Sequence, residues 1–154
     1  MNKTLSVSAI QNGTVIDHIT SDQTLRIMHM LRLLDKKHKV TVGFNLPSKR
    51  MKYKDLIKIE DHVLTTKEAN EITIFAPDAT INIIQNFEVV QKIITTLPPH
   101  ISGVFVCPNS NCITNKEHVE SRFAVAGQGN NQVKLMCRFC EKEFDRNQVK
   151  VKVA

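Results

Sequence analysis

The sequence predicts an α+β protein: an N-terminal ferredoxin-like βαββαβ sandwich followed by a small all-β domain organised around four cysteines. Three observations lead to this prediction. Strand-like and helix-like segments alternate over the first two thirds of the chain, Pro98 and Pro99 interrupt it, and every cysteine lies beyond that interruption. Because consecutive prolines end regular structure, we expect two domains, at residues 1–98 and 99–154.

The first half of the N-terminal domain reads as two strands and a helix. Residues 5–10 alternate polar and apolar side chains, which predicts a strand, and residues 14–19 form a second β-prone stretch after Gly13. Ser21 and Asp22 are candidates for the N-cap of the helix that follows. The apolar positions of that helix repeat with helical spacing: Leu25, Ile27, Met28, Met30, Leu31, Leu33 and Leu34.

The second half of this domain continues with strands and one short helix. We expect strands at residues 40–46, ended by Pro47, and at residues 55–60. Thr65 and Glu68 have the spacing of a capping box and predict a helix start. Further strands are expected at residues 72–76, 81–84 and 87–90. The resulting order of elements is that of a split βαβ sandwich, with two helices on one face of an antiparallel sheet.

Composition narrows the class of protein. The 154 residues are 42% hydrophobic and 23% charged, which is ordinary for a globular chain. No apolar run approaches the roughly 20 residues needed to span a bilayer. Residues 1–10 do not resemble a secretory signal, so we expect a cytoplasmic protein with no membrane partner.

The charge balance favours an anionic partner. The formal net charge is +6 and the isoelectric point about 9.3, which suits a nucleotide, a nucleic acid or an acidic protein surface. Trp is absent and aromatic residues make up only 5% of the chain. That composition is poor for stacking single-stranded bases and counts against nucleic acid.

The four cysteines form two close pairs. Cys107 and Cys112 enclose four residues, and Cys137 and Cys140 enclose two. In a reducing compartment such pairs indicate a metal site, and four thiolates give the closed tetrahedral shell of a structural Zn²⁺. An iron–sulfur cluster or a redox dithiol remain alternatives. A catalytic zinc is disfavoured because it needs an open coordination position.

No catalytic constellation is visible, but a few side chains suit an anion. The chain lacks both the G-x-G-x-x-G and the G-x-x-x-x-G-K motif. Lys58 and Lys92 follow apolar strand residues, and either point to solvent or converge on a phosphate. Asp17 is either a turn residue or an acceptor for ribose hydroxyls. Periodicity leaves these alternatives open.

Several runs together resemble one known family. They are GTVIDHI at residues 13–19, NLPS at 45–48, KDLIKIE at 54–60, FEVV at 87–90, CPNSNCI at 107–113 and CEKEF at 140–144. In this order they resemble the regulatory chain of aspartate carbamoyltransferase over nearly the whole sequence. The resemblance implies a non-catalytic subunit of pyrimidine biosynthesis. It also implies ATP as activator and CTP, often with UTP, as inhibitors.

The same resemblance implies partners and site residues. The domain at residues 1–98 would bind the nucleotide effectors, and the zinc domain at residues 99–154 would dock on the catalytic chains, with regulatory homodimers bridging catalytic trimers. Zinc would be held by Cys107, Cys112, Cys137 and Cys140. Asn109, Asn111 and Glu141 would lie at the catalytic-chain interface. The implied effector-binding residues are Val7, Ala9, Ile10, Val15, Asp17, His18, Lys58, Asn82, Ile84, Val89 and Lys92.

The alternative function is a zinc-ribbon module that binds nucleic acid. It accounts for the isoelectric point and the cysteines. It leaves Asp17, the apolar pocket residues and the pair Asn109 and Asn111 without a role, so we expect no nucleic-acid partner. Strong, salt-dependent binding of DNA or RNA by the isolated chain would favour this alternative.

Overall fold

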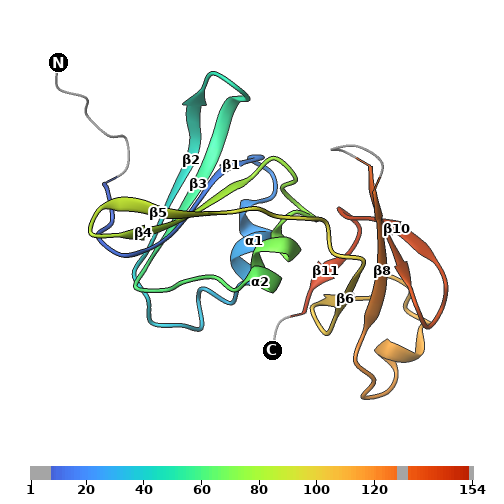
Figure 1. The fold of residues 1–154 in the computed structure, drawn as a ribbon. Coiled ribbons are helices and arrows are strands. Elements are labelled where there is room, and N and C mark those ends of the chain that lie inside the picture. The colour runs from blue at the N-terminus through green and yellow to red at the C-terminus, as the bar shows by residue number, and fades with distance from the viewer. Residues whose placement is uncertain (1–7, 128–131, 153–154) are drawn as a thin grey trace.

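The computed structural model describes residues 8–127 and 132–152 and has two β units joined by residues 94–99 (Figure 1). The first unit is one antiparallel sheet with strand order β2-β3-β1-β4-β5. The order β2-β3-β1-β4 is that of a split βαβ sandwich, to which β5 adds an edge, so the predicted fold class is confirmed. Its elements are β1 (Gly13–Ile19), α1 (Thr24–Met30), β2 (Val40–Ser48), β3 (Lys52–Glu60), α2 (Thr66–Ile72), β4 (Thr80–Gln85) and β5 (Glu88–Ile93).

The second unit is all-β apart from one 3-10 turn, as predicted. Its strands form a four-stranded sheet in the order β10-β9-β8-β6 and a separate pair of β11 with β7. Helices α1 and α2 lie between the large sheet and this unit (Figure 1). The elements are β6 (His100–Ser102), β7 (Phe105–Val106), η1 (Ile113–Asn115), β8 (Arg122–Gly127), β9 (Val133–Cys137), β10 (Glu143–Asp145) and β11 (Lys150–Val151).

The two faces of the large sheet differ in burial. Ile16, Ile57 and Ile81 point to the helices and are at most 2% exposed. They pack with Ile27 of α1 and Ile72 of α2 in the main core. Each such side chain contributes roughly 1.5–3 kcal/mol when fully buried. The opposite face has no helix over it in the described part of the chain.

The two helices begin in different ways. Thr65 is the N-cap of α2 and makes the predicted capping box: its hydroxyl accepts from the Glu68 amide, and its own amide donates to the Glu68 carboxylate, both at 3.1 Å. The prediction for α1 was wrong. Its N-cap is Gln23, which makes no side-chain cap bond, and Ser21 and Asp22 precede it in a turn.

The predicted apolar face of α1 was too wide. The helix has only seven residues and ends at Met30, so Leu34 falls outside its period and is 74% exposed. Leu25 is 61% exposed as well. Thr24 and Ile27 are the residues of the helix that are buried.

Three strand predictions also need correction. Residues 8–10 form no strand, and residues 5–7 lie outside the described residues. Residues 72–76 end α2 and form a turn, although Ile74 and Phe75 are fully buried, so the apolar run indicated burial and not conformation. Pro47 does not stop β2 but pairs with Tyr53 inside it. An edge strand tolerates proline because its outward amide has no partner to lose.

Candidate metal centre and effector face

The four cysteine sulfurs come together in the second unit. All four Sγ atoms lie within 4.8 Å of one another, with Cys107 to Cys140 and Cys112 to Cys137 each at 3.7 Å. A disulfide needs about 2.05 Å, so these are free thiols. A tetrahedral Zn²⁺ with bonds of about 2.3 Å has sulfur–sulfur edges of about 3.8 Å. The cluster therefore has the dimensions of a four-thiolate metal site.

Local hydrogen bonds shape the two turns that present these sulfurs. The Asn115 amide donates to the carbonyl oxygens of Cys107 and Asn109, both at 2.8 Å, and closes the first turn. In the second turn the Glu141 backbone amide donates to the Cys137 carbonyl at 2.8 Å. Each cysteine pair is thus held by its own short loop, and the fold brings the two loops together.

Burial affects the thiols unequally. It raises the pKa of Cys107 and of Cys137. It also raises the pKa of Cys140, but hydrogen bonds from the Lys142 backbone amide and the Asn109 side chain outweigh it and lower that pKa to about 7. A bound cation deprotonates coordinating thiols, so it would offset the cost of burying them. The donor set contains only sulfur, and three of the four thiols are buried, which suits a structural ion.

On the first unit, four predicted effector residues form a row across four strands. Val15 of β1 pairs directly with Lys58 of β3 and with Asn82 of β4, and Asn82 pairs with Lys92 of β5. Directly paired residues point to the same face of a sheet. This face is the one opposite the helices. Three strand spacings separate the two lysine backbones by about 14 Å.

Asp17 lies on the same face, just before an irregularity in β1. Strand alternation places it beside Val15, and the register with β3 then shifts between Ile16 and Ile19, where His18 has a φ of 59°. The shift lets Ile19 return to the helix side, where it is fully buried. His18 Nδ1 lies 3.0 Å from the Thr80 hydroxyl oxygen, so its ring is oriented by β4.

A third lysine, which the sequence reasoning missed, lies at this site. Lys54 Nζ forms an ion pair with Asp17, 3.0 Å from each carboxylate oxygen. Its spacing of four residues from Lys58 on one strand was the available signal, because such residues share a face. Lys58 Nζ donates to the Ser8 carbonyl at 2.8 Å. Burial lowers the pKa of Lys58, and the charge of Asp17 partly opposes that shift.

Two apolar members of the predicted set, Ile84 and Val89, lie on the same face. Ile84 is 8% exposed and pairs with Val89 of β5, which is 52% exposed. Ile10 is buried just before β1, and Ala9 is exposed next to it. Ile10 and Ile84 are buried without belonging to the core under the helices. Val7 lies outside the described residues.

The three predicted interface residues sit on the loops that carry the cysteines. Asn111 and Glu141 are exposed and Asn109 is half-buried, with its side-chain oxygen accepting from the Asn111 amide at 3.1 Å. Two large apolar side chains on the same loops are also exposed, Ile113 at 46% and Phe139 at 44%. Polar groups around exposed apolar ones are typical of a surface that another protein covers.

Comparison with known proteins assigns both units. Residues 5–96 match the family described as the aspartate carbamoyltransferase regulatory chain, allosteric domain, and residues 99–150 match its metal binding domain. The chain belongs to the aspartate carbamoyltransferase regulatory chain family. Within the described residues, no helix is both long and apolar enough to cross a membrane.

Curated relatives carry the same description. This chain is 50% identical over 146 residues to the aspartate carbamoyltransferase regulatory chain of Yersinia enterocolitica, and the match covers 94% of each protein. It is 51% identical over 145 residues to that of Tolumonas auensis, covering 94% of this chain and 93% of the relative. The corresponding chain of Photorhabdus laumondii is 49% identical over 145 residues, with 94% of each covered.

Membership confirms the predicted class. The regulatory chain is a non-catalytic subunit of an enzyme complex, and it implies catalytic chains as partners. The metal-binding description and the cysteine cluster together support the prediction of a bound metal. The zinc-ribbon nucleic-acid alternative is not favoured by these findings.

Proposed function

We propose that this regulatory chain binds nucleoside triphosphates on the open face of its large sheet and transmits the binding to the catalytic chains. ATP acts as the activator, and CTP, with UTP, as the inhibitor. The observation that carries the proposal is the row of Lys58, Val15, Asn82 and Lys92 across four strands, with Asp17 beside it. Residues 1–98 are the effector domain and residues 99–154 the docking domain.

The residues divide the work by chemistry. Lys58 and Lys92 offer ammonium groups to the phosphates as point charges. Asp17 accepts from ribose hydroxyls, with His18 at its side, and Lys54 holds the Asp17 carboxylate in place before a ligand arrives. The apolar and amide side chains form the base and sugar surface: Val7, Ala9, Ile10, Val15, Asn82, Ile84 and Val89.

Affinity and selectivity then have different origins. Phosphate contacts are common to ATP, CTP and UTP, so they supply affinity for all three. The base contacts supply the difference. Regulation needs two quaternary states that bind a given nucleotide unequally, and a coupling of about 1–3 kcal/mol is enough for useful control.

In the metal domain we propose one structural Zn²⁺ per chain, held by Cys107, Cys112, Cys137 and Cys140. Sulfur–sulfur distances of 3.7 Å support zinc because they fit its tetrahedral radius. Asn109, Asn111 and Glu141 contact the catalytic chain, and homodimers of this chain bridge catalytic trimers. Free thiol ligands are stable in a reducing compartment, which supports a cytoplasmic location.

Calorimetric titration of the purified chain with ATP and CTP tests the effector site. Lys58→Ala and Lys92→Ala should each weaken the binding of both nucleotides by about 10-fold, which corresponds to losing about 1.4 kcal/mol from a charge-assisted contact. Lys116→Ala, an exposed lysine of the metal unit, is the matched control and should change neither. Weaker binding of only one nucleotide would mean that these lysines do not bind the phosphates that both nucleotides share.

Mixing the chain with catalytic trimers of an aspartate carbamoyltransferase tests the larger claim. We expect a complex of higher mass, with activity that ATP raises and CTP lowers. A complex that forms but ignores both nucleotides would refute the effector proposal and leave the family assignment intact.

A further inference from the structure

Helix α1 makes hydrogen bonds both to the large sheet and to the metal unit. Toward the sheet, the Thr24 hydroxyl donates to the buried carboxylate of Asp55 at 2.5 Å. Toward the metal unit, the Arg26 guanidinium donates to the side-chain oxygen of Asn147 at 3.0 Å and to its backbone oxygen at 2.9 Å. A third bond runs from Arg26 to the Arg146 carbonyl at 3.1 Å. One turn of helix therefore holds both units.

Gln23 adds a second donor to the same acceptor. Its side-chain amide donates to the Asn147 side-chain oxygen at 2.9 Å, although Gln23 is only 2% exposed. The other end of that amide, Oε1, is buried and has no hydrogen-bond partner among the described residues. A buried polar atom without a partner is costly. The Gln23 side chain thus makes a specific hydrogen bond between the two units while its own oxygen has no partner. This suits a contact between the units that must break and form again.

An aromatic series continues from Arg26 toward the metal centre. The guanidinium carbon lies 5.8 Å from the ring centre of Phe75, and Phe75 meets Phe105 edge-on at 5.5 Å. Phe105 in turn meets Phe123 at 6.0 Å. Phe123 is fully buried and pairs across strands with Cys137, one of the cluster cysteines. Packed side chains thus connect α1 to the metal site without a gap.

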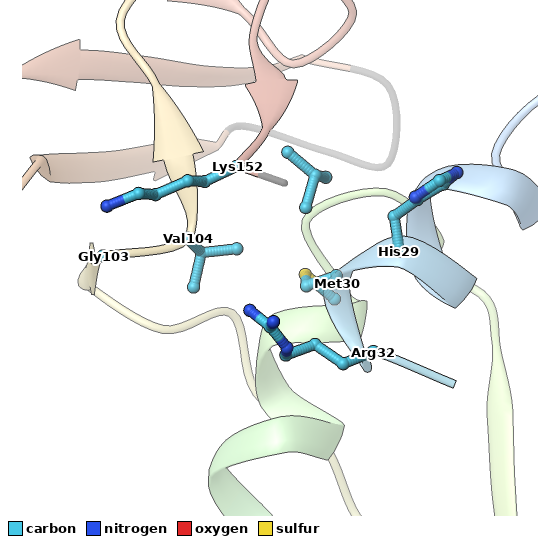
Figure 2. Close-up of a pocket in the computed structure, with 7 residues that line it drawn as sticks. His29, Met30, Arg32, Gly103, Val104 and Lys152 are labelled. Atoms are coloured by element: carbon cyan, nitrogen blue, oxygen red, sulfur yellow. The ribbon is translucent and has the colours of Figure 1, made fainter. Parts of the chain in front are cut away.

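The other end of α1 borders a cavity on the side of the metal unit. A cavity of about 350 Å³ separates it from the metal unit, with His29, Met30 and Arg32 on one wall and Val104 and Lys152 on the other (Figure 2). Gly103 and Val151 complete the lining. Leu31 and Leu33, just after α1, are buried in the core and anchor the helix to the first unit. The cavity therefore leaves room for the metal unit to turn about its contacts with Gln23 and Arg26, which is the geometry of a pivot.

We propose that Gln23, Arg26 and Asn147 form the pivot that couples the effector face to the metal domain. The path to it is short: β1 carries Asp17, shifts register at His18, and leads directly into the turn before α1. A ligand that repositions Asp17 would move the start of α1 and, through Arg26, the turn that carries Asn147. The direction of this signal rests on the proposed effector function, whereas the pivot itself does not.

Three variants and one control test the pivot in the complex assembled with catalytic trimers. Arg26→Ala, Asn147→Ala and the double variant should each reduce the nucleotide-induced change in substrate half-saturation by about threefold or more. The double variant should lose no more than either single one, because both remove the same contact. Nucleotide dissociation constants should stay within about twofold. Lys39→Ala, whose ammonium pairs with Glu60 at 3.6 Å and does not line the cavity, is the control and should regulate normally.

A second measurement does not depend on nucleotides. Differential scanning calorimetry of the full chain should show one transition for the wild type and two for Arg26→Ala and Asn147→Ala, because the units then unfold separately. If the wild-type complex ignores nucleotides, the effector proposal fails and calorimetry alone decides the pivot. The pivot is overturned if both single variants regulate like the wild type, lose nucleotide binding, or still unfold in one transition.

Discussion

Removing the metal should unfold the second unit while leaving the large sheet folded. The described part of this unit buries six large apolar side chains apart from its cysteines: Ile101, Phe105, Phe123, Val133, Leu135 and Val149. Apart from its contacts with α1 and Phe75, much of its stability comes from the cluster, where structural zinc typically contributes about 10–16 kcal/mol. That exceeds the roughly 5–15 kcal/mol by which a whole domain is stable. The loss of the ion is therefore decisive for this unit.

The assay combines chelation with two measurements. A chromogenic chelator should release one zinc ion per chain, and circular dichroism should lose the β signal of the second unit, with recovery when Zn²⁺ is returned. Cys112→Ala should reproduce the loss without a chelator, because Cys112 is 2% exposed and its sulfur lies 3.7 Å from that of Cys137. Ser110→Ala, on the same loop but exposed, is the control. An unchanged spectrum after complete metal release would refute the reasoning.

Three further predictions concern the first unit and the linker. Thr65→Ala removes the capping box of α2 and should lower the free energy of unfolding by about 1 kcal/mol in urea titrations, and an unchanged midpoint would contradict the cap. Burial raises the pKa of Glu71, so ionisation of this carboxyl group destabilises the fold as pH rises. Glu71→Gln should therefore raise the melting temperature at pH 7 but not at a pH below the ordinary carboxyl pKa. An equal gain at the two pH values would exclude titration as the cause. Replacing Pro98 and Pro99 with glycine should weaken nucleotide effects on activity while leaving nucleotide binding intact, since a flexible joint transmits less displacement; unchanged regulation would contradict it.

Local features of the fold were predictable from the sequence. The capping box at Thr65 depends on residues three apart and formed as expected. The β-prone stretches at residues 14–19 and 81–84 located β1 and β4 to within one residue at each end. Local patterns failed where distant packing decided the outcome. Residues 72–76 are apolar and β-prone, yet they form a buried turn because α2 ends there against the core.

The candidate effector site shows the same division. Resemblance to a family supplied its residues, but periodicity could not say whether Lys58 and Lys92 share a face. That depends on the pairing of four strands, of which only β4 and β5 are neighbours in the sequence. Lys54 was missed because an ion pair with Asp17 is a contact between strands. The register shift that returns Ile19 to the helix side is invisible in the pattern of β1 alone.

The amino-acid order by itself determined the metal chemistry and the class of fold, since ligand type, ligand spacing and the succession of strands and helices are properties of neighbouring residues. Only the tertiary structure decided which side chains meet: the lysine row, the Asp17 ion pair and the contact of Arg26 with Asn147. The hydrogen bond of Lys54 to Asp17 joins residues 37 positions apart, and that of Arg26 to Asn147 joins residues 121 positions apart. Such contacts depend on strand register and on how the two units pack, and no local pattern encodes either.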